Sequence, residues 1–90
     1  MLIISDHKWN KFVADSEIYG FKLSNDEFNY YIRYHQEEEY PNDFFELRVC
    51  VESREISIET SNVRYSGFET NGEELEVIYD LIINGFVEKK

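Results

Sequence analysis

Residues 45–59, FELRVCVESREISIE, alternate apolar and polar side chains on both sides of a short polar break. Such alternation is typical of a strand with one buried face, because successive side chains point to opposite sides of a sheet. Two alternating runs joined by a short break predict an antiparallel hairpin. A tight turn at Ser53-Arg54 pairs Val51 with Ile56. A longer loop is the alternative, because neither turn residue suits a primed turn.

A second hairpin is predicted on the N-terminal side of the first. Phe21 and Leu23 alternate with polar residues, and Asn25-Asp26 supplies turn chemistry before a return strand over 28–35. A loop centred on Asn25-Asp26 pairs Leu23 with Phe28. The inner face of the return strand is then expected to carry Phe28, Tyr30, Ile32 and Tyr34.

Two helices are predicted outside the strands. The first begins after the N-cap candidate Ser5 and ends near Ser16, with Trp9, Phe12 and Val13 on one face. The second begins at the capping box formed by Thr70 and Glu73, and Gly85 suits the left-handed residue that ends it. Its buried stripe is expected to consist of Leu75, Ile78, Tyr79 and Ile82, widened by Val77 and Leu81.

The element order α-β-β-β-β-α predicts a single α+β domain over residues 1–90. An antiparallel sheet with both helices packed on one face would bury the apolar stripes. Residues 62–67 stay ambiguous between a loop and a short extra strand.

The charge of the chain is unevenly distributed. Nineteen acidic residues stand against nine basic ones, and residues 37–80 alone carry a net charge of −10. Such a field attracts and steers basic partners. Fifteen aromatic residues argue against disorder. Direct nucleic-acid binding is disfavoured, because phosphate neutralisation needs clustered Lys and Arg.

Few residues have the chemistry of a catalytic site. The only imidazoles belong to His7 and His35, and the only thiol to Cys50. No phosphate loop, nucleophile elbow or metal-ligand motif occurs, so we expect no enzyme activity, no catalytic residues, no metal and no cofactor. A single cysteine, the lack of a long apolar run and the lack of a signal peptide predict a cytoplasmic protein without a membrane partner.

The acidic segment 37–46, EEEYPNDFFE, is the main candidate for a contact surface. It joins the two hairpins and mixes carboxylates with aromatic rings, and interfaces favour aromatic anchors among steering charges. The start of the last helix adds further carboxylates. The expected partner-binding residues are Glu37, Glu38, Glu39, Tyr40, Asp43, Phe44, Glu46, Glu73 and Glu74.

These features predict a non-catalytic acidic binding protein. The leading hypothesis is an inhibitor of a basic, nucleic-acid-binding protein through partial nucleic-acid mimicry, as in phage anti-CRISPR and anti-restriction proteins. One alternative is an immunity protein for a nuclease toxin. The other is a small structural or regulatory domain that forms a homodimer through an open sheet edge.

Overall fold

The computed structural model describes residues 1–34, 44–60 and 73–90, and the following statements concern these residues. The chain forms β1 (Leu2–Ile4), the 3₁₀ helix η1 (Asp6–Lys8), α1 (Trp9–Asp15), β2 (Lys22–Leu23), β3 (Asn29–Tyr34), β4 (Phe45–Cys50), β5 (Ile56–Thr60), α2 (Glu73–Ile83) and β6 (Val87–Lys89).

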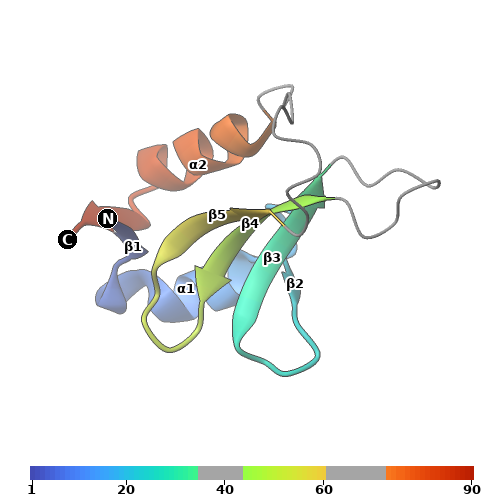
Figure 1. Ribbon diagram of the computed structural model, residues 1–90. Coiled ribbons are helices and arrows are strands. Elements are labelled where there is room, and N and C mark those ends of the chain that lie inside the picture. The colour runs from blue at the N-terminus through green and yellow to red at the C-terminus, as the bar shows by residue number, and fades with distance from the viewer. Residues whose placement is uncertain (35–43, 61–72) are drawn as a thin grey trace.

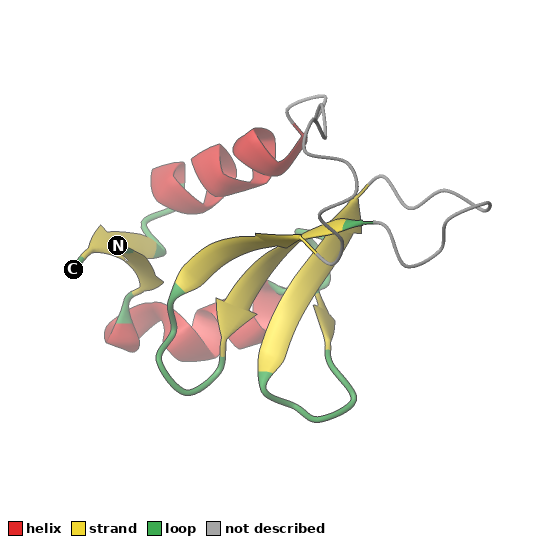
Figure 2. Ribbon diagram, in the orientation of Figure 1, coloured by secondary structure: helices red, strands yellow, loops and turns green. Residues whose placement is uncertain are grey.

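The main sheet contains four antiparallel strands in the order β2-β3-β4-β5. Figure 1 shows α1 behind this sheet and α2 running past its upper edge, and Figure 2 shows the same layers by element type. Phe12 of α1 and Leu81 of α2 belong to one core cluster with Leu47 and Val49 of β4. The predicted α+β class, with both helices on one face of an antiparallel sheet, is therefore confirmed.

A second, two-stranded sheet joins the two ends of the chain and was not predicted from the sequence. β1 pairs antiparallel with β6, with Ile3 opposite Glu88. The Ile4 amide also donates to the Arg54 carbonyl at 2.9 Å, and the Ser5 amide donates to the Phe86 carbonyl at 2.8 Å. These bonds attach the N-terminal segment to both the β4–β5 loop and the C-terminal strand.

Both predicted hairpins form, but each has a longer loop than the tight turn predicts. Val49 lies opposite Ile56, and Leu23 lies opposite Tyr30, so each register is shifted by two residues. Arg54 in one loop and Glu27 in the other adopt left-handed conformations, each with φ of 64°. Because side chains alternate with a period of two, a shift of two leaves the sheet faces unchanged. The alternative of a longer second loop is thus confirmed.

The first hairpin contributes less to the core than predicted. The longer loop places Phe28 outside β3, where it is 66% exposed, and Leu23 on the short β2 is 43% exposed. Both predictions of an inward position are therefore wrong. Phe21 and Tyr34, by contrast, are buried as expected.

Aromatic rings fill the centre of the core. Phe12 makes edge contacts with Phe21, Tyr30 and Phe86 at centroid distances of 5.4, 5.5 and 6.3 Å, and Trp9 stacks on Phe12 at 5.4 Å. Such contacts add to the stabilisation from area burial. The core is thus concentrated where α1 meets the sheet.

The C-terminal end of α2 is closed as the sequence predicts. Gly85 has φ of 77°, its amide donates to the Ile82 carbonyl, and the Phe86 amide donates to the Leu81 carbonyl, both at 3.0 Å. This is the bond pattern of a Schellman motif. It turns Phe86 into the core and starts β6. Thr70 of the proposed capping box lies outside the described residues, and α2 begins at Glu73.

The buried side of α2 differs from the predicted stripe. Leu75, Tyr79 and Ile82 are 62%, 63% and 49% exposed, whereas Leu81 is fully buried and Glu74 is 4% exposed. Seven of the eleven residues from Glu73 to Ile83 are apolar or aromatic, so apolar side chains occupy more than one side of the helix. The helix packs on the core through Leu81, Val77 and Ile78. The predicted burial of these three residues is therefore confirmed, and that of Leu75, Tyr79 and Ile82 is wrong.

Candidate functional site

The structure describes only part of the predicted partner-binding surface. Phe44, Glu46 and Glu74 are described with their side chains, and Glu73 is described as the first residue of α2. The remaining predicted contact residues lie outside the described residues: Glu37, Glu38, Glu39, Tyr40 and Asp43.

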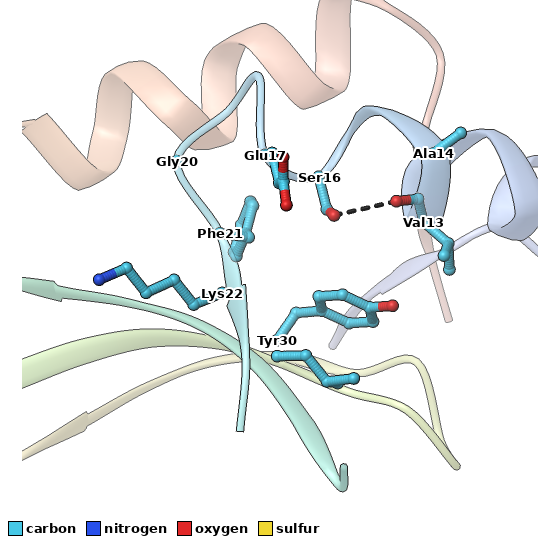
Figure 3. A pocket seen from close by; sticks show the side chains of 9 residues that line it. Val13, Ala14, Ser16, Glu17, Gly20, Phe21, Lys22 and Tyr30 are labelled. Atoms are coloured by element: carbon cyan, nitrogen blue, oxygen red, sulfur yellow. Dashed lines mark hydrogen bonds between the residues drawn. The ribbon is translucent and has the colours of Figure 1, made fainter. Parts of the chain in front are cut away.

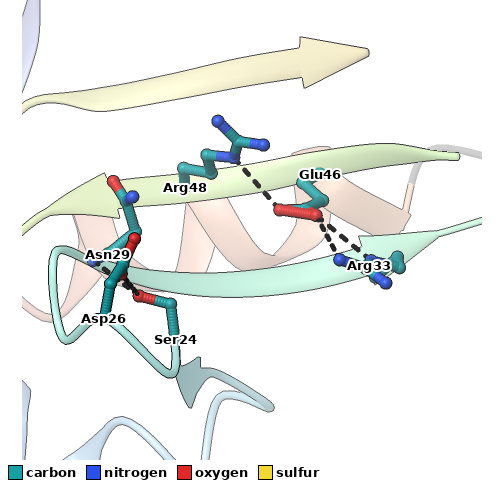
Figure 4. A network of polar contacts seen from close by, with 6 residues as sticks. All are labelled: Ser24, Asp26, Asn29, Arg33, Glu46 and Arg48. Atoms are coloured by element: carbon teal, nitrogen blue, oxygen red, sulfur yellow. Dashed lines mark hydrogen bonds and ion pairs between the residues drawn. The ribbon is translucent and has the colours of Figure 1, made fainter. Parts of the chain in front are cut away.

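Glu46 is not the solvated carboxylate that its polar strand position predicts. Its side chain is 5% exposed. One oxygen accepts from Arg33 Nε at 3.1 Å and Nη2 at 2.8 Å, and the other accepts from Arg48 Nε at 3.0 Å (Figure 4). The carboxylate is buried by the two arginines that neutralise it, which corrects the prediction of solvation.

The network lies on the sheet face opposite the helices. Cross-strand pairing sets Arg33 opposite Glu46 and Tyr31 opposite Arg48, while Lys22 on β2 lies on the other side of Tyr31. The Arg33 guanidinium lies 3.8 Å from the Phe44 ring centroid and 5.4 Å from that of Tyr31. Cations over aromatic faces are attracted by the ring quadrupole. Two aromatics without a predicted core position, Tyr31 and Phe44, are therefore partners of Arg33.

A hollow of about 320 Å³ opens beside this network, and its lining is mostly polar. A second hollow, of about 310 Å³, shares Tyr31 and Arg33 with it and reaches Lys22. Three cations thus border the two hollows on an otherwise acidic protein. The first hollow is lined by Ser24, Asn25, Asp26, Asn29, Tyr31, Arg33, Glu46 and Arg48.

Sequence reasoning did not identify this cationic cluster. The sequence predicts Arg48 opposite Glu59 and Arg33 on the outer face of the first hairpin. The predicted Arg48–Glu59 pair is wrong, because the shifted register places Ser57 opposite Arg48. The missing information was the pairing of β3 with β4, which sets Arg33 opposite Glu46. A cation and an anion at opposed polar positions would have been the signal for that register.

Glu74 at the start of α2 is also buried, so the expectation that its carboxylate is solvated is wrong as well. The opposite side of the helix carries four large exposed apolar residues, which we call the α2 face: Leu75, Tyr79, Ile82 and Ile83. Glu76 and Asp80 are exposed beside it and lie one turn apart. The α2 face therefore combines an aromatic residue, three aliphatic residues and a border of negative charge.

A third hollow, of about 780 Å³, lies between the end of α1 and the β2–β3 hairpin. Figure 3 shows Ser16 and Glu17 on one side and Lys22 and Tyr30 on the other. The Ser16 hydroxyl donates to the Val13 carbonyl at 2.9 Å. The ionisable side chains that line the hollow belong to Glu17, Lys22 and Tyr30.

Cys50 is partly exposed and lies on the outer sheet face. Hydrogen bonding to the Ser53 side chain and backbone lowers the pKa of its thiol, while burial and the charge of Glu52 oppose that shift. Of the two histidines, His7 lies in η1, and His35 is outside the described residues.

Over residues 1–34, 44–60 and 73–90, no group of three or more His, Cys, Asp or Glu side chains is placed to hold a metal ion. Within the same ranges, every helix is too short or too polar to cross a membrane. Comparison with protein-family models, curated proteins and solved structures gives no match.

Proposed function

We propose that this protein is a non-catalytic acidic binding protein that inhibits a basic, nucleic-acid-binding protein, and that the α2 face is its principal contact surface. The observation that carries the proposal is the exposure of Leu75, Tyr79, Ile82 and Ile83 on one helix, beside exposed carboxylates. Contiguous exposed apolar side chains mark interaction sites, and a tyrosine among them supplies a typical anchor.

Charge complementarity favours a basic partner over a second copy of this chain. α2 carries four acidic residues and no basic one. Two copies that met through the α2 face would bring Glu76 and Asp80 of each copy close to those of the other. Like charges that face each other weaken binding between two copies. A partner with Lys or Arg around an apolar groove would be attracted to the carboxylates and would also pack on the α2 face.

A nucleic-acid-binding protein is the class of partner that best fits the whole chain. Its binding groove is basic because it neutralises phosphates. A protein with a net charge of −10 is attracted to that groove. Mimicry is partial in this proposal, because Arg33 and Arg48 neutralise the outer sheet face around Glu46. The 37–46 segment remains a second proposed contact, and its residues 37–43 lie outside the described residues.

The test compares proteins captured from the native host lysate by the wild-type protein and by Tyr79→Ala. Phe28→Ala is the matched control, because Phe28 is 66% exposed and Tyr79 is 63% exposed, yet Phe28 lies in the β2–β3 loop. We expect Tyr79→Ala to weaken binding of the captured protein about 30-fold, the cost of about 2 kcal/mol typical of an aromatic hot spot. Phe28→Ala should bind like the wild type.

Three further results decide the proposal. The captured protein must be basic, rising salt must release it, and nucleic acid must compete with its binding. If Tyr79→Ala and Phe28→Ala bind equally well, the α2 face is not the contact surface. A captured nuclease toxin would favour the immunity-protein alternative. A salt-resistant homodimer in place of a basic partner would contradict the proposal and favour the structural domain.

A further inference from the structure

We infer that the outer face of the sheet holds a binding site for a phosphate group, formed by Arg33 and Arg48 with Lys22 at its border. This site is separate from the α2 face and does not depend on the proposed function. It occupies the hollow of about 320 Å³ beside the Arg33–Glu46–Arg48 network, on the sheet face opposite α1 and α2.

Glu46 fixes the two arginines in position. Its buried carboxylate accepts three hydrogen bonds from them, and the Arg33 guanidinium also lies over the Phe44 ring. Both arginine side chains keep about a third of their surface exposed, at 37% and 36%. The guanidinium groups are therefore held in place before any ligand arrives, which lowers the entropy lost on binding.

The network leaves donors for a ligand. Between described residues, Arg48 donates only through Nε, and Arg33 donates through Nε and Nη2. An arginine has five N–H donors in a planar fork that matches phosphate geometry. With respect to residues 1–34, 44–60 and 73–90, both Arg48 Nη atoms and Arg33 Nη1 remain for the ligand. One carboxylate shared by two guanidinium groups also leaves one excess positive charge.

Two further charged side chains, Lys22 and Asp26, change the net charge around the two hollows. Lys22 borders the adjoining hollow, which shares Tyr31 and Arg33 with the first one. Asp26 lines the first hollow, and its negative charge repels an anion. Its Oδ1 is already occupied, because it accepts hydrogen bonds from the Ser24 hydroxyl at 2.5 Å and from the Phe28 amide at 3.0 Å. Three cations and two carboxylates therefore border the two hollows, and Glu59 lies opposite Glu46 on the neighbouring strand β5. An anion is the chemically matched ligand because the guanidinium groups offer oriented N–H donors.

The dimensions allow a group larger than phosphate alone. Pockets of about 300 Å³ and above accept small organic ligands. The Tyr31 ring lines both hollows and offers an apolar surface next to the cations. A phosphate monoester with a compact ring would therefore use both parts of the site.

The experiment titrates the full chain with inorganic phosphate and, separately, with phenyl phosphate, and follows the arginine Nε–H signals by NMR. We expect saturable shifts at Arg33 and Arg48 with both probes. Tighter binding of phenyl phosphate assigns the site to a phosphate ester, whereas equal affinities assign it to free phosphate. The absence of a saturable shift with either probe overturns the inference.

Variants locate the site. Arg48→Gln should weaken binding about tenfold, equivalent to the loss of one charge-assisted hydrogen bond. Lys22→Gln makes no change to the Glu46 network and should weaken binding several-fold, which keeps the test valid if Arg48→Gln unfolds. Asp26→Asn should tighten binding, because it removes an opposing charge.

Lys11→Gln is the control, since Lys11 pairs with Asp15 on α1 and should not affect binding. Equal weakening by Lys11→Gln and Lys22→Gln would mean that only net charge matters, which contradicts a site.

Discussion

Replacing Glu46 by glutamine tests whether the outer-face network stabilises the fold. The side chain keeps its size, but the charge that accepts three hydrogen bonds from Arg33 and Arg48 is lost. A hydrogen bond to a charged group contributes about 1 kcal/mol more than a neutral one. For the two bonds from Arg33 to one oxygen, this difference gives about 2 kcal/mol. The bond from Arg48 is lost because an amide nitrogen cannot accept it, which adds at least about 1 kcal/mol and gives about 3 kcal/mol in all. Since the arginines are about a third exposed and water partly solvates them, we reduce this figure to about 2 kcal/mol.

The assay is urea denaturation, in which Glu46→Gln should lower the free energy of unfolding by about 2 kcal/mol with an unchanged slope. A thermal scan should show a decrease of roughly 10 °C in Tm. High salt should leave most of this difference in place, because a buried pair is screened less than a surface pair.

The matched control is Glu59→Gln. Glu59 lies directly opposite Glu46 on β5, but it is exposed. Opposed like charges destabilise a sheet, so removing this one should raise stability by up to about 0.5 kcal/mol. A cost below about 0.5 kcal/mol for Glu46→Gln, or equal effects of the two variants, would refute the argument that Glu46 is a buried structural charge.

Three further predictions concern the loops and the last helix. Glu27→Gly should raise the free energy of unfolding by about 0.5 kcal/mol in urea, because glycine accepts the φ of 64° without the strain that a side chain brings. Ser24→Ala should raise the pKa of Asp26 toward its ordinary value of 3.8 in an NMR titration, because the Ser24 hydroxyl is the main cause of its lowered pKa. A lowered pKa in the folded state stabilises the fold above the unfolded pKa, and this contribution is lost as the pH falls through the folded pKa, so Ser24→Ala should also reduce the acid sensitivity of stability. Leu81→Ala should cost about 3 kcal/mol in urea denaturation while Leu75→Ala costs less than about 0.5 kcal/mol, and equal costs would contradict the orientation of α2.

Local sequence patterns predicted where helices and strands lie better than they predicted which residues pair between strands. The alternation over 45–59 correctly assigned the sheet faces of β4, because Leu47 and Val49 are fully buried. The loop conformations were harder to predict. Arg54 and Glu27 adopt φ angles that their residue types rarely favour, and each extends its loop and shifts a register by two. Each side chain kept its predicted face of the sheet, and the fold class was unchanged, because both registers shifted by an even number of residues.

Non-local features were outside the reach of these patterns. β1 and β6 are three residues each and pair across almost the whole chain, so no turn motif connects them. α2 packs on the core cluster through Leu81, Val77 and Ile78, and helical periodicity does not choose this side of a helix that is apolar on more than one side. The burial of Glu46 depended on the β3–β4 register, which unites Arg33 and Arg48 around it. The candidate site could not be located until these long-range contacts were known.

The pairing of β1 with β6 brings the two ends of the chain into contact. The Lys90 amide donates to the Met1 carbonyl at 2.9 Å, so a linker of a few residues would join them into a ring. This contact closes the longest loop in the protein, and loop closure of that length is entropically costly and slow to form. A circular permutant opened between Glu52 and Ser53, both exposed in the β4–β5 loop, would convert this contact into a local hairpin. During synthesis of this permutant, β6 and β1 would be neighbours in the sequence and would pair early. β5 would be made first and β4 last, so these two strands would pair last.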